Sequence, residues 1–527
     1  MSGKPNFLFI ITDQQRKDHL SCYNENSILK TPHIDSIAKE GIKFTRFYCN
    51  NPICMPNRST IFTGKYPSVH RVTTNGRNLP QGTQTFTEIL NNSGDYHTAS
   101  FGKIHLNYFG QNYRGKFDSP KISNEFVLPK DYKKIPNYTP YFGLEESKII
   151  SGHGTLLGHP DYFEWMKKKL KTDEELQIKL GIKPEASEKD IEKKIRRLFH
   201  IKVKESFIEL QVWKHKLPEE LYSTTFVKDN VIKFLDRFSN GNYDKNRFFT
   251  ICSFPDPHAP FTPPGKYYNM FNPEDVELPD TFDNDHKSHP DFIQEHYQHS
   301  KKTEGTNDKD FPSAKDLSAE EAKRVIAASY GMEKMIDDAV GEILKALEDL
   351  GLRENTIVIY TTDHGELGGE HRLFFKGPFL YQPLINIPFI ISVPGGIRNK
   401  ISDSLASSID IPETILELAG FEIPRYMQGK SLLPILEKPD EKIKKSILIE
   451  MDDNYNDQKT RTIVTQNWRL TFYKDFGELY NLKKDPKELN NLWDENKYQE
   501  IKLELILKLL RKIAYEAEIP VLRDCDY

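Results

Sequence analysis

The sequence contains little cysteine and no long hydrophobic run. Its 5 cysteines among 527 residues are scattered along the chain as Cys22, Cys49, Cys54, Cys252 and Cys525. The number is odd and no pair has the short spacing of a zinc site, so we expect neither a disulfide framework nor structural zinc. No apolar stretch approaches the ~20 residues of a membrane span, and the N-terminal run Phe7 to Ile11 is too short for a signal-peptide core. We therefore expect a cytoplasmic protein that contacts no membrane.

The chain also lacks a large excess of charge of either sign. Its formal net charge of −4 gives no general attraction to nucleic acid, so any anion must be bound by a local cluster of residues. The composition, 37% hydrophobic and 28% charged, is ordinary for a globular protein. A chain of this length exceeds the size at which one core usually stops growing, so we expect one large domain with a smaller companion.

Strand and helix patterns alternate through most of the chain. The apolar runs at 6–12, 247–254 and 355–362 predict strands that are buried on both faces. A long helical pattern, 318–351, opens with a capping box and lies directly before the last of these strands. A helix that leads into a strand indicates a parallel crossover connection. We predict an α/β domain over residues 1–440 with a large, mainly parallel mixed sheet.

Two segments of this domain do not fit the alternation. Residues 165–215 are rich in Lys and Glu with helical spacing, and residues 281–317 are polar with many His, Asp and Lys. We interpret both as insertions, the first a solvated helix and the second a surface loop. From about residue 440 the pattern changes to short strands of the antiparallel kind followed by a helix. We predict a small C-terminal α+β subdomain with an antiparallel sheet over 441–527.

Two pairs of polar residues follow predicted strands. Asp13 and Gln14 come directly after the first strand. Asp363 and His364 come directly after the strand 355–362. A single acid in such a position usually caps a helix, but the carboxyl ends of strands in these sheets are also where ligands bind. Two such pairs favour one shared divalent cation of the harder kind, and the absence of clustered cysteine argues against structural zinc.

Cys54 lies in the segment NNPICMPNRSTIFTGKYPSVH. Pro56 favours a turn into a helix, and Arg58 follows one helical turn after the cysteine. A helix N-terminus and a nearby cation both lower the pKa of a thiol, so a thiolate nucleophile is the first interpretation. The sequence offers no obvious Cys-His-Asn set that would support a thiol hydrolase. A buried, unreactive cysteine is the alternative, and these residues alone leave both open.

Basic residues recur near predicted strand ends. They occur in the segments FGKIHL, FPDPHAPF and GEHRLFFKGPF, and they are Lys103, His105, His258, His371 and Lys376. Each one alone is most often a surface group or a histidine whose ring is satisfied by hydrogen bonds. Brought together with Arg58 and one metal ion, all of them except His371 would hold an oxyanion and neutralise its leaving group.

The segment CMPNRSTIFTGK resembles the sulfatase signature Cys-x-Pro-x-Arg followed by Thr-Gly-Arg, with Lys65 in place of the last arginine. The similarity extends over almost the whole chain, through TDQQRKDHLSCY, GKIHL, FPDPHAPF, TTDHGELGGEHRLFFKGPFLYQ and GELYNLKKDPKELNNL. The two insertions are the parts that do not match. The resemblance implies an alkaline-phosphatase-like α/β sandwich and the hydrolysis of sulfate monoesters, with a small-molecule or sugar sulfate ester as substrate.

The resemblance implies that Cys54 is a precursor. A separate maturation enzyme would oxidise it to formylglycine, whose hydrated aldehyde presents two hydroxyl groups on one carbon. One oxygen would attack sulfur, and the other hydroxyl would later expel sulfate as the aldehyde forms again. Thiol chemistry then becomes the minor alternative. If Cys54 stays unmodified, the chain would be an anion-binding protein without turnover.

The metal site departs from many sulfatases. By resemblance, Asp13, Gln14, Asp363 and His364 are the metal ligands, and the diol at residue 54 completes the coordination. Many sulfatases carry two consecutive acids and an Asp-Asn pair at these places, with calcium bound. The Asp-Gln and Asp-His pairs resemble those of phosphonate monoester hydrolases in the same superfamily. Calcium is the ion expected from the family, and the nitrogen ligand leaves manganese or magnesium open.

The remaining roles also come from the resemblance. Arg58 and Lys103 would hold the diol and sulfate oxygens, and His105 would take the proton of the second hydroxyl. His258 and Lys376 would stabilise or protonate the departing ester oxygen. Two further residues are assigned to substrate contacts, Asn75 and His371. A site with ligands for one metal ion suits monoanionic esters. A phosphonate monoester or phosphodiester hydrolase with the same nucleophile is therefore the alternative function. A homo-oligomer is compatible with the sequence.

Overall fold

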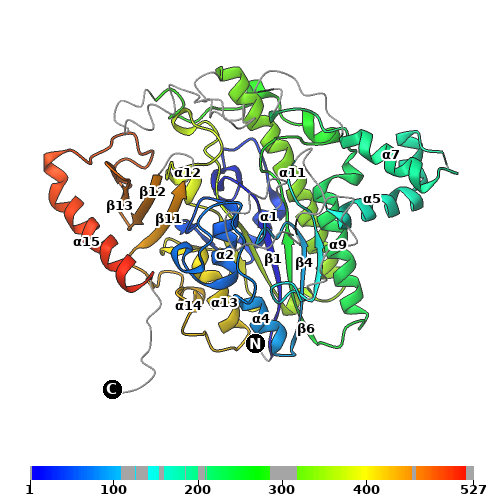
Figure 1. The fold of residues 1–527 in the computed structure, drawn as a ribbon, viewed down its shortest axis with the longest axis horizontal. Helices are drawn as coiled ribbons and strands as arrows, with labels where there is room; N and C mark the ends of the chain where they lie inside the picture. The colour runs from blue at the N-terminus through cyan, green and yellow to red at the C-terminus, as the bar shows by residue number, and fades with distance from the viewer. Residues whose placement is uncertain are drawn as a thin grey trace.

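A computed structural model describes most of the chain (Figure 1). It covers residues 3–108, 125, 140–153, 159–183, 185–199, 208, 211–284, 317–453 and 458–517. Within these ranges the fold is a central sheet with helices on both faces and a second, smaller sheet at one side. No helix among the described residues is long and apolar enough to cross a lipid bilayer. The predicted fold class is confirmed.

The central sheet has eight strands. They are β1 (Asn6–Thr12), β2 (Ile42–Phe44), β4 (Tyr96–Gly102), β5 (Glu146–Ile149), β6 (Arg247–Ser253), β7 (Thr356–Thr362), β8 (Phe389–Ser392) and β9 (Lys400–Ser402). Their order is β5-β4-β6-β1-β7-β8-β2-β9, and the first five are parallel to one another. β8 is antiparallel to both β7 and β2. The sheet is therefore mixed and mainly parallel, as predicted. Two short strands, β3 (Phe47–Tyr48) and β10 (Ala406–Ser407), form a separate parallel pair.

Strand β1 shows why the interior of a central strand is apolar. All of its residues are buried. Phe7, Phe9 and Ile11 belong to the hydrophobic cluster on one face of the sheet, whereas Leu8 and Ile10 belong to the cluster on the other face. Successive side chains of a strand point to opposite faces, so the interior positions 7–11, which are covered on both sides, are all apolar, and the polar residues Asn6 and Thr12 lie at the two ends.

Helices supply the two coverings of the sheet (Figure 1). On the face of Leu8 lie α1 (Pro32–Lys39), α9 (Ser223–Ser239) and α11 (Ala319–Asp349). On the opposite face lie α2 (Cys54–Thr63), α4 (Phe86–Asn92) and α13 (Ile411–Leu418). The shorter helices of the large domain are α3 (Pro67–His70), α12 (Gln382–Ile385) and α14 (Leu433–Glu437).

Helix α11 is the long helix predicted before β7. Its capping box is present, because the Ser318 side chain accepts from the Glu321 amide while Glu321 accepts from the Ser318 amide. The helix ends before Gly351, whose φ of 69° lies in the left-handed region. The helix returns the chain to the start of β7, so that β7 runs parallel to β1.

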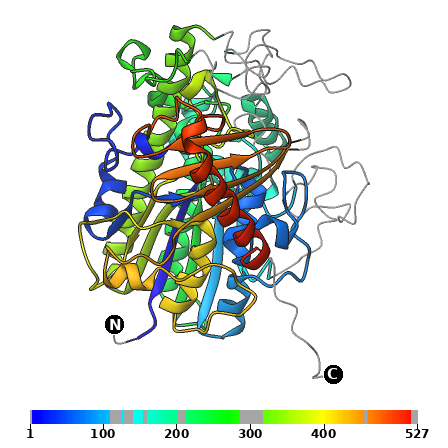
Figure 2. The same ribbon diagram turned by 90° about the vertical axis from the view of Figure 1, so that its left-hand side faces the viewer.

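The C-terminal part of the chain forms the predicted antiparallel subdomain (Figure 2). Its elements are β11 (Ile447–Asp453), β12 (Gln458–Val464), β13 (Trp468–Phe472), β14 (Gly477–Asn481) and α15 (Gln499–Tyr515). Ile447 and Ile449 pack into the core of the large domain, whereas Leu448 packs with α15. The small sheet is thus held between the large domain and its own helix. The boundary near residue 440 stays a prediction.

The two predicted insertions differ in what the structure describes. The first, 165–215, contains most of α5 (Pro160–Thr172) and all of α6 (Glu174–Leu180) and α7 (Glu188–Phe199). Charged residues on α5 and α7 give these helices the solvated surfaces that the sequence suggested. Tyr162 and Met166 of α5 are buried in the helix layer next to α9. Most of the second, 281–317, lies outside the described residues.

Candidate active site

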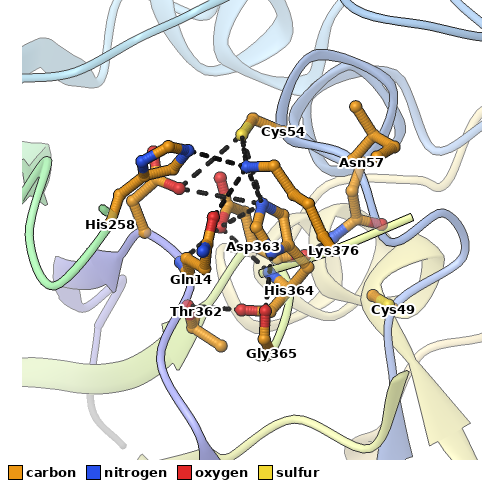
Figure 3. Close-up of polar contacts among 12 residues, drawn as sticks. Gln14, Cys49, Cys54, Asn57, His258, Thr362, Asp363, His364, Gly365 and Lys376 are labelled. Carbon is orange, nitrogen blue, oxygen red and sulfur yellow. Dashed lines mark hydrogen bonds and ion pairs between the residues drawn. The ribbon is translucent and has the colours of Figure 1, made fainter. Parts of the chain in front are cut away.

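Neighbouring parallel strands end at the same edge of the central sheet. In the register of the sheet, Thr12 of β1 lies opposite Thr362 of β7. On the other side, Ser253 of β6 lies between Ile11 of β1 and Gly102 of β4. Residues that follow these strands therefore meet although they are far apart in the sequence. Figure 3 shows side chains from these strand ends pointing toward one another.

Four of the predicted metal-binding positions form one buried cluster. Asp13, Cys54, Asp363 and His364 each offer one ligand atom, and these atoms lie within 4.8 Å of one another. Gln14 has a φ of 64°, a left-handed conformation that residues other than glycine adopt rarely. Its backbone amide donates to Asp363 Oδ1 at 3.2 Å. This bond holds the unusual turn after β1 and keeps Gln14 beside the cluster.

The Lys376 ammonium lies close to several of the atoms that would bind a metal ion (Figure 3). Its Nζ lies 2.8 Å from Gln14 Oε1, 3.1 Å from His364 Nε2 and 3.0 Å from Cys54 Sγ. These atoms thus already attract a cation. Carboxylate and amide oxygens with one imidazole nitrogen are suitable ligands for a hard or borderline divalent ion. The residues fit one divalent cation, and the ion itself stays a prediction.

Cys54 is the first residue of α2 and is buried. Its Sγ lies 3.1 Å from His364 Nε2 and 3.6 Å from Asp13 Oδ1. Burial alone would raise the pKa of the thiol, but the cations Lys103 and Lys376 outweigh burial and lower that pKa well below its ordinary value. Position 54 is therefore one at which the surroundings stabilise a negative charge.

The other described cysteines have the opposite character. Burial raises the pKa of Cys22, Cys49 and Cys252 above the ordinary value of a thiol. Cys49 lies to the side of the cluster in Figure 3, and its Sγ contacts the carbonyl oxygen of Leu384 at 3.8 Å. Of the cysteines in the described ranges, Cys54 is thus the one placed to serve as a nucleophile or its precursor.

The first turn of α2 is fixed by two side-chain hydrogen bonds, one to a residue outside the helix and one from a residue within it. Its N-cap residue, Ile53, provides no capping side chain. Instead, Asn75 Oδ1 accepts from the Met55 amide at 3.0 Å, and the Asn57 amide group donates to the backbone carbonyl of Asp363. The first bond satisfies a backbone amide at the helix end, and the second joins α2 to the metal cluster. A substrate contact of Asn75 stays a prediction, because its amide already serves the helix end.

Arg58 connects two strand ends. Its Nε donates to Asp363 Oδ2 at 2.7 Å, and its Nη1 donates to the Lys103 carbonyl at 2.9 Å and to Ser253 Oγ at 3.0 Å. Its Nη2 is buried, lies 3.8 Å from Asp13 Oδ2 and has no hydrogen-bond partner among the described residues. Nε and Nη1 therefore hold the strand ends in position, and Nη2 is the nitrogen left to bind an anion.

Basic side chains line the site beside the metal cluster. Lys103 Nζ donates to Asp13 and lies 3.2 Å from His153 Nε2. The rings of His153 and His258 are stacked at 3.6 Å with an interplanar angle of 8°. His258 Nε2 in turn lies 2.8 Å from Lys376 Nζ. The structure therefore brings together Lys103, His258 and Lys376, as the sequence predicted, and adds His153 to them.

His105 is buried beside position 54. Its ring lies near enough to the Cys54 side chain for the two groups to influence each other's pKa. Burial, followed by the nearby charge of Lys103, lowers the pKa of His105 to about 3. The carboxylate of Glu125 holds the loop in place, because it accepts from the His105 amide and from the Leu106 amide at 2.7 Å. A neutral imidazole in this position can accept a proton.

His371 and Lys65 each contact an aromatic ring. The His371 ring stacks on Tyr381 at 4.0 Å, and its Nδ1 lies 3.0 Å from Asn284 Nδ2. The Lys65 ammonium lies over the Tyr426 ring, 4.6 Å from the ring centre. A role of His371 in substrate binding stays a prediction.

Two residues near the site were not predicted from the sequence, His153 and Glu366. His153 stands in a glycine-rich segment without a helix or strand pattern, so no signal marked it. Glu366 stands in the segment DHGEL, three residues after Asp363, and its carboxylate accepts a hydrogen bond from Gln14 Nε2. Glu366 stands two residues after the predicted ligand His364. This closeness to a predicted ligand pair could have marked it as a candidate.

We expect one divalent cation per chain at this cluster. In a metal-loaded crystal structure, ligand atoms of Asp13, Gln14, Asp363 and His364 should lie roughly 2.0–2.6 Å from the ion. Elemental analysis gives the stoichiometry, and Asp13→Asn should weaken the affinity because it removes a carboxylate charge. Asp161→Asn, at a surface ion pair with Lys148, is the matched control. Ligand atoms more than about 6 Å from a bound ion would contradict the site.

Comparison with known proteins gives a consistent picture. The family model described as Sulfatase matches residues 5–421, and a model described as N-sulphoglucosamine sulphohydrolase, C-terminal, matches residues 369–515. An arylsulfatase from Clostridium perfringens is 28% identical over 517 residues, which cover 97% of this chain and 94% of that relative. An N-acetylglucosamine-6-O-sulfatase from Bacteroides thetaiotaomicron is 25% identical and covers 95% of this chain and 85% of the relative.

Among solved structures, a phosphonate monoester hydrolase of Agrobacterium radiobacter has the same fold. It superposes with a TM-score of 0.74 at 24% sequence identity, and the match covers 97% of this chain and 96% of that one. At this identity the likeness concerns the fold. It extends through both the large domain and the C-terminal subdomain.

Proposed function

The chain belongs to the sulfatase family and is a sulfuric ester hydrolase, and from this premise we propose that its nucleophile is a formylglycine formed from Cys54. The observation that supports this most is the place of Cys54. It is the buried first residue of α2, with Sγ 3.1 Å from His364 Nε2 and 3.0 Å from Lys376 Nζ. A separate maturation enzyme would carry out the oxidation.

The modified residue and the metal ion supply different parts of the chemistry. The hydrated aldehyde supplies two hydroxyl groups, one to form a bond to sulfur and one to remain for the second step. A divalent cation held by Asp13, Gln14, Asp363 and His364 supplies positive charge that favours a deprotonated nucleophile and a bound sulfate oxygen. Calcium is the ion of the family, with manganese and magnesium as alternatives because of the imidazole ligand.

In the first step the S–O bond to the alcohol breaks, and the departing oxygen takes a proton. We assign this proton to His258 and Lys376, and the assignment is supported by the 2.8 Å between their nitrogens and by the contact of Lys376 with position 54. Arg58 and Lys103 stabilise the sulfate oxygens, with Arg58 Nη2 as the available donor. The products are the free alcohol and a sulfated residue 54.

In the second step His105 accepts the proton of the remaining hydroxyl. With a formylglycine at position 54, loss of this proton would let the C–O bond to sulfate break and the aldehyde form again, ready for hydration by water. The neutral state of His105 and its position near residue 54 support this role. Because the leaving sulfate is expelled from within the residue, no water needs to attack the covalent intermediate.

We propose a sugar sulfate as the substrate class. The support is the relative from Bacteroides thetaiotaomicron that acts on N-acetylglucosamine-6-O-sulfate, as its name states. Nothing in the described residues restricts the alcohol to an aryl group. The cytoplasmic location expected from the sequence stays a prediction.

Hydrolysis of phosphonate monoesters or phosphodiesters is the second candidate. It is favoured by one observation, the Gln14 and His364 pair where many sulfatases carry an acid and an asparagine. The same nucleophile and the same cations would serve a monoanionic phosphorus ester.

Three measurements test the proposal. Mass spectrometry of the peptide that contains Cys54 should show an aldehyde or its hydrate in active enzyme, and an intact thiol in fully active enzyme would overturn the nucleophile. The value of kcat/KM for 4-nitrophenyl sulfate should exceed that for 4-nitrophenyl phenylphosphonate. A preference for the phosphonate would overturn the assignment of sulfate esters and leave the nucleophile in place. A glucosamine 6-sulfate should release sulfate more efficiently than the aryl ester if sugars are the natural class.

A further inference from the structure

Glu366 has no part in the chemistry described above, yet it lies against a proposed metal ligand. Its side chain is buried, with 4% of the residue exposed. One carboxylate oxygen, Oε2, accepts from Gln14 Nε2. The other, Oε1, accepts from the backbone amides of Gly368 at 3.0 Å and of Phe375. Among the residues that the structure describes, the hydrogen-bond partners of this carboxylate are all donors, and one of them, Phe375, directly precedes Lys376.

Gln14 can serve as a metal ligand in only one of its two orientations. Its amide has an oxygen that can bind a cation and an NH₂ group that cannot. In the structure Oε1 faces the Lys376 ammonium at 2.8 Å, whereas Nε2 faces Glu366. A rotation of the amide by half a turn would place the NH₂ group against the cation. A carboxylate at position 14 would not have this problem, because its two oxygens are equivalent.

We propose that Glu366 is a positioning residue that fixes the amide of Gln14 with its oxygen toward the divalent cation. A carboxylate accepts hydrogen bonds and donates none, so it can pair only with the NH₂ group of Gln14. Through Phe375 the same carboxylate also holds the segment that carries Lys376. The inference rests on the metal site of the proposed function.

Glu366→Gln removes this selectivity without a large change in size. If the new amide turns its oxygen toward the backbone amides of Gly368 and Phe375, its NH₂ group faces Gln14. Gln14 must then present its oxygen to position 366 and its NH₂ group to the cation. If the new amide turns the other way, its NH₂ group opposes two backbone donors. Either arrangement leaves a buried donor unpaired or removes a metal ligand.

The exchange Gln14→Glu with Glu366→Gln restores every pairing. The carboxylate now at position 14 accepts from the NH₂ group at position 366 and offers its second oxygen to the cation. The new amide oxygen at position 366 accepts from the backbone amides of Gly368 and Phe375. The total charge of the two positions is unchanged, but the carboxylate now faces the ion directly, so Gln14→Glu alone is the reference that shows how much of the recovery comes from this charge.

The test is the affinity of the full-length protein for Mn²⁺, measured by competition with a chelator and repeated with Ca²⁺. We expect Glu366→Gln to weaken binding by ~10–100-fold, as for other residues that orient metal ligands. The double variant should recover at least about tenfold of this loss. Glu370→Gln is the control, because that buried carboxylate pairs with Arg16 at 2.9 Å and should leave the metal affinity unchanged.

Two results would overturn the inference. One is a metal affinity of Glu366→Gln within about threefold of the wild type, well below the usual effect of such residues. The other is a double variant that binds no more tightly than Glu366→Gln. If the single variant fails to fold, the double variant decides alone, since it must fold and bind the ion. None of these measurements uses a substrate, so failure here is distinct from failure of the proposed sulfatase activity.

Discussion

Replacing Cys54 with alanine is expected to lower kcat for a sulfate ester by ~10⁴–10⁶-fold, the range found when a catalytic nucleophile is removed. Alanine cannot be converted to formylglycine and offers no oxygen to attack sulfur. The remaining cations could still bind the ester, so KM should change far less than kcat. Binding of a sulfate ester without turnover is therefore the expected state of this variant.

The fold should tolerate the substitution, because the thiol is small and its neighbours are polar groups of the site. The control is Cys252→Ala, which removes a buried cysteine from β6 on the face of the sheet covered by α9 and α11. This variant should keep its activity and lose some thermal stability. Activity of Cys54→Ala within about tenfold of the wild type would contradict the assignment of the nucleophile. Cys54→Ser should also be nearly inactive unless the maturation enzyme accepts serine.

Much of the fold could be predicted because local patterns and tertiary structure agree. The apolar run of β1 predicted burial on both faces, and Phe9 and Ile10 do lie in opposite clusters. The capping box of α11 predicted the start of that helix to the residue. Asp13 and Asp363 could be paired in advance because parallel strands end at one edge, and Thr12 and Thr362 are indeed in register.

Other features depend on contacts that no local pattern records. The φ of 64° at Gln14 is held by Asp363, a residue 349 positions away, and nothing in the run TDQQ indicates it. His153 joins the site through its stacking on His258 and its contact with Lys103 Nζ, 3.2 Å from its Nε2. Strand β14 was not predicted, because its sequence GELYN is short and partly polar. It forms a strand through pairing with β13, so tertiary context outweighed the weak local signal.

The two-step mechanism predicts opposite effects for the loss of His105 and of His258. If His105 deprotonates the second hydroxyl, His105→Ala should slow the release of sulfate from the enzyme more than it slows the release of alcohol. Loss of a general base typically costs ~10²–10⁴-fold, which is enough for the sulfated enzyme to accumulate. His258 acts earlier, on the leaving alcohol, so its loss should slow the first step instead.

Rapid mixing with a chromogenic sulfate ester distinguishes these cases. His105→Ala should release a burst of about one alcohol per active site, followed by a slow steady state. Mass spectrometry should then find the sulfated peptide that contains position 54. His258→Ala should show no burst, and its loss of activity should grow with the pKa of the leaving alcohol, because a better leaving group needs no proton. If His105→Ala shows neither a burst nor a trapped adduct, and both products slow together, then His105 does not act in the second step.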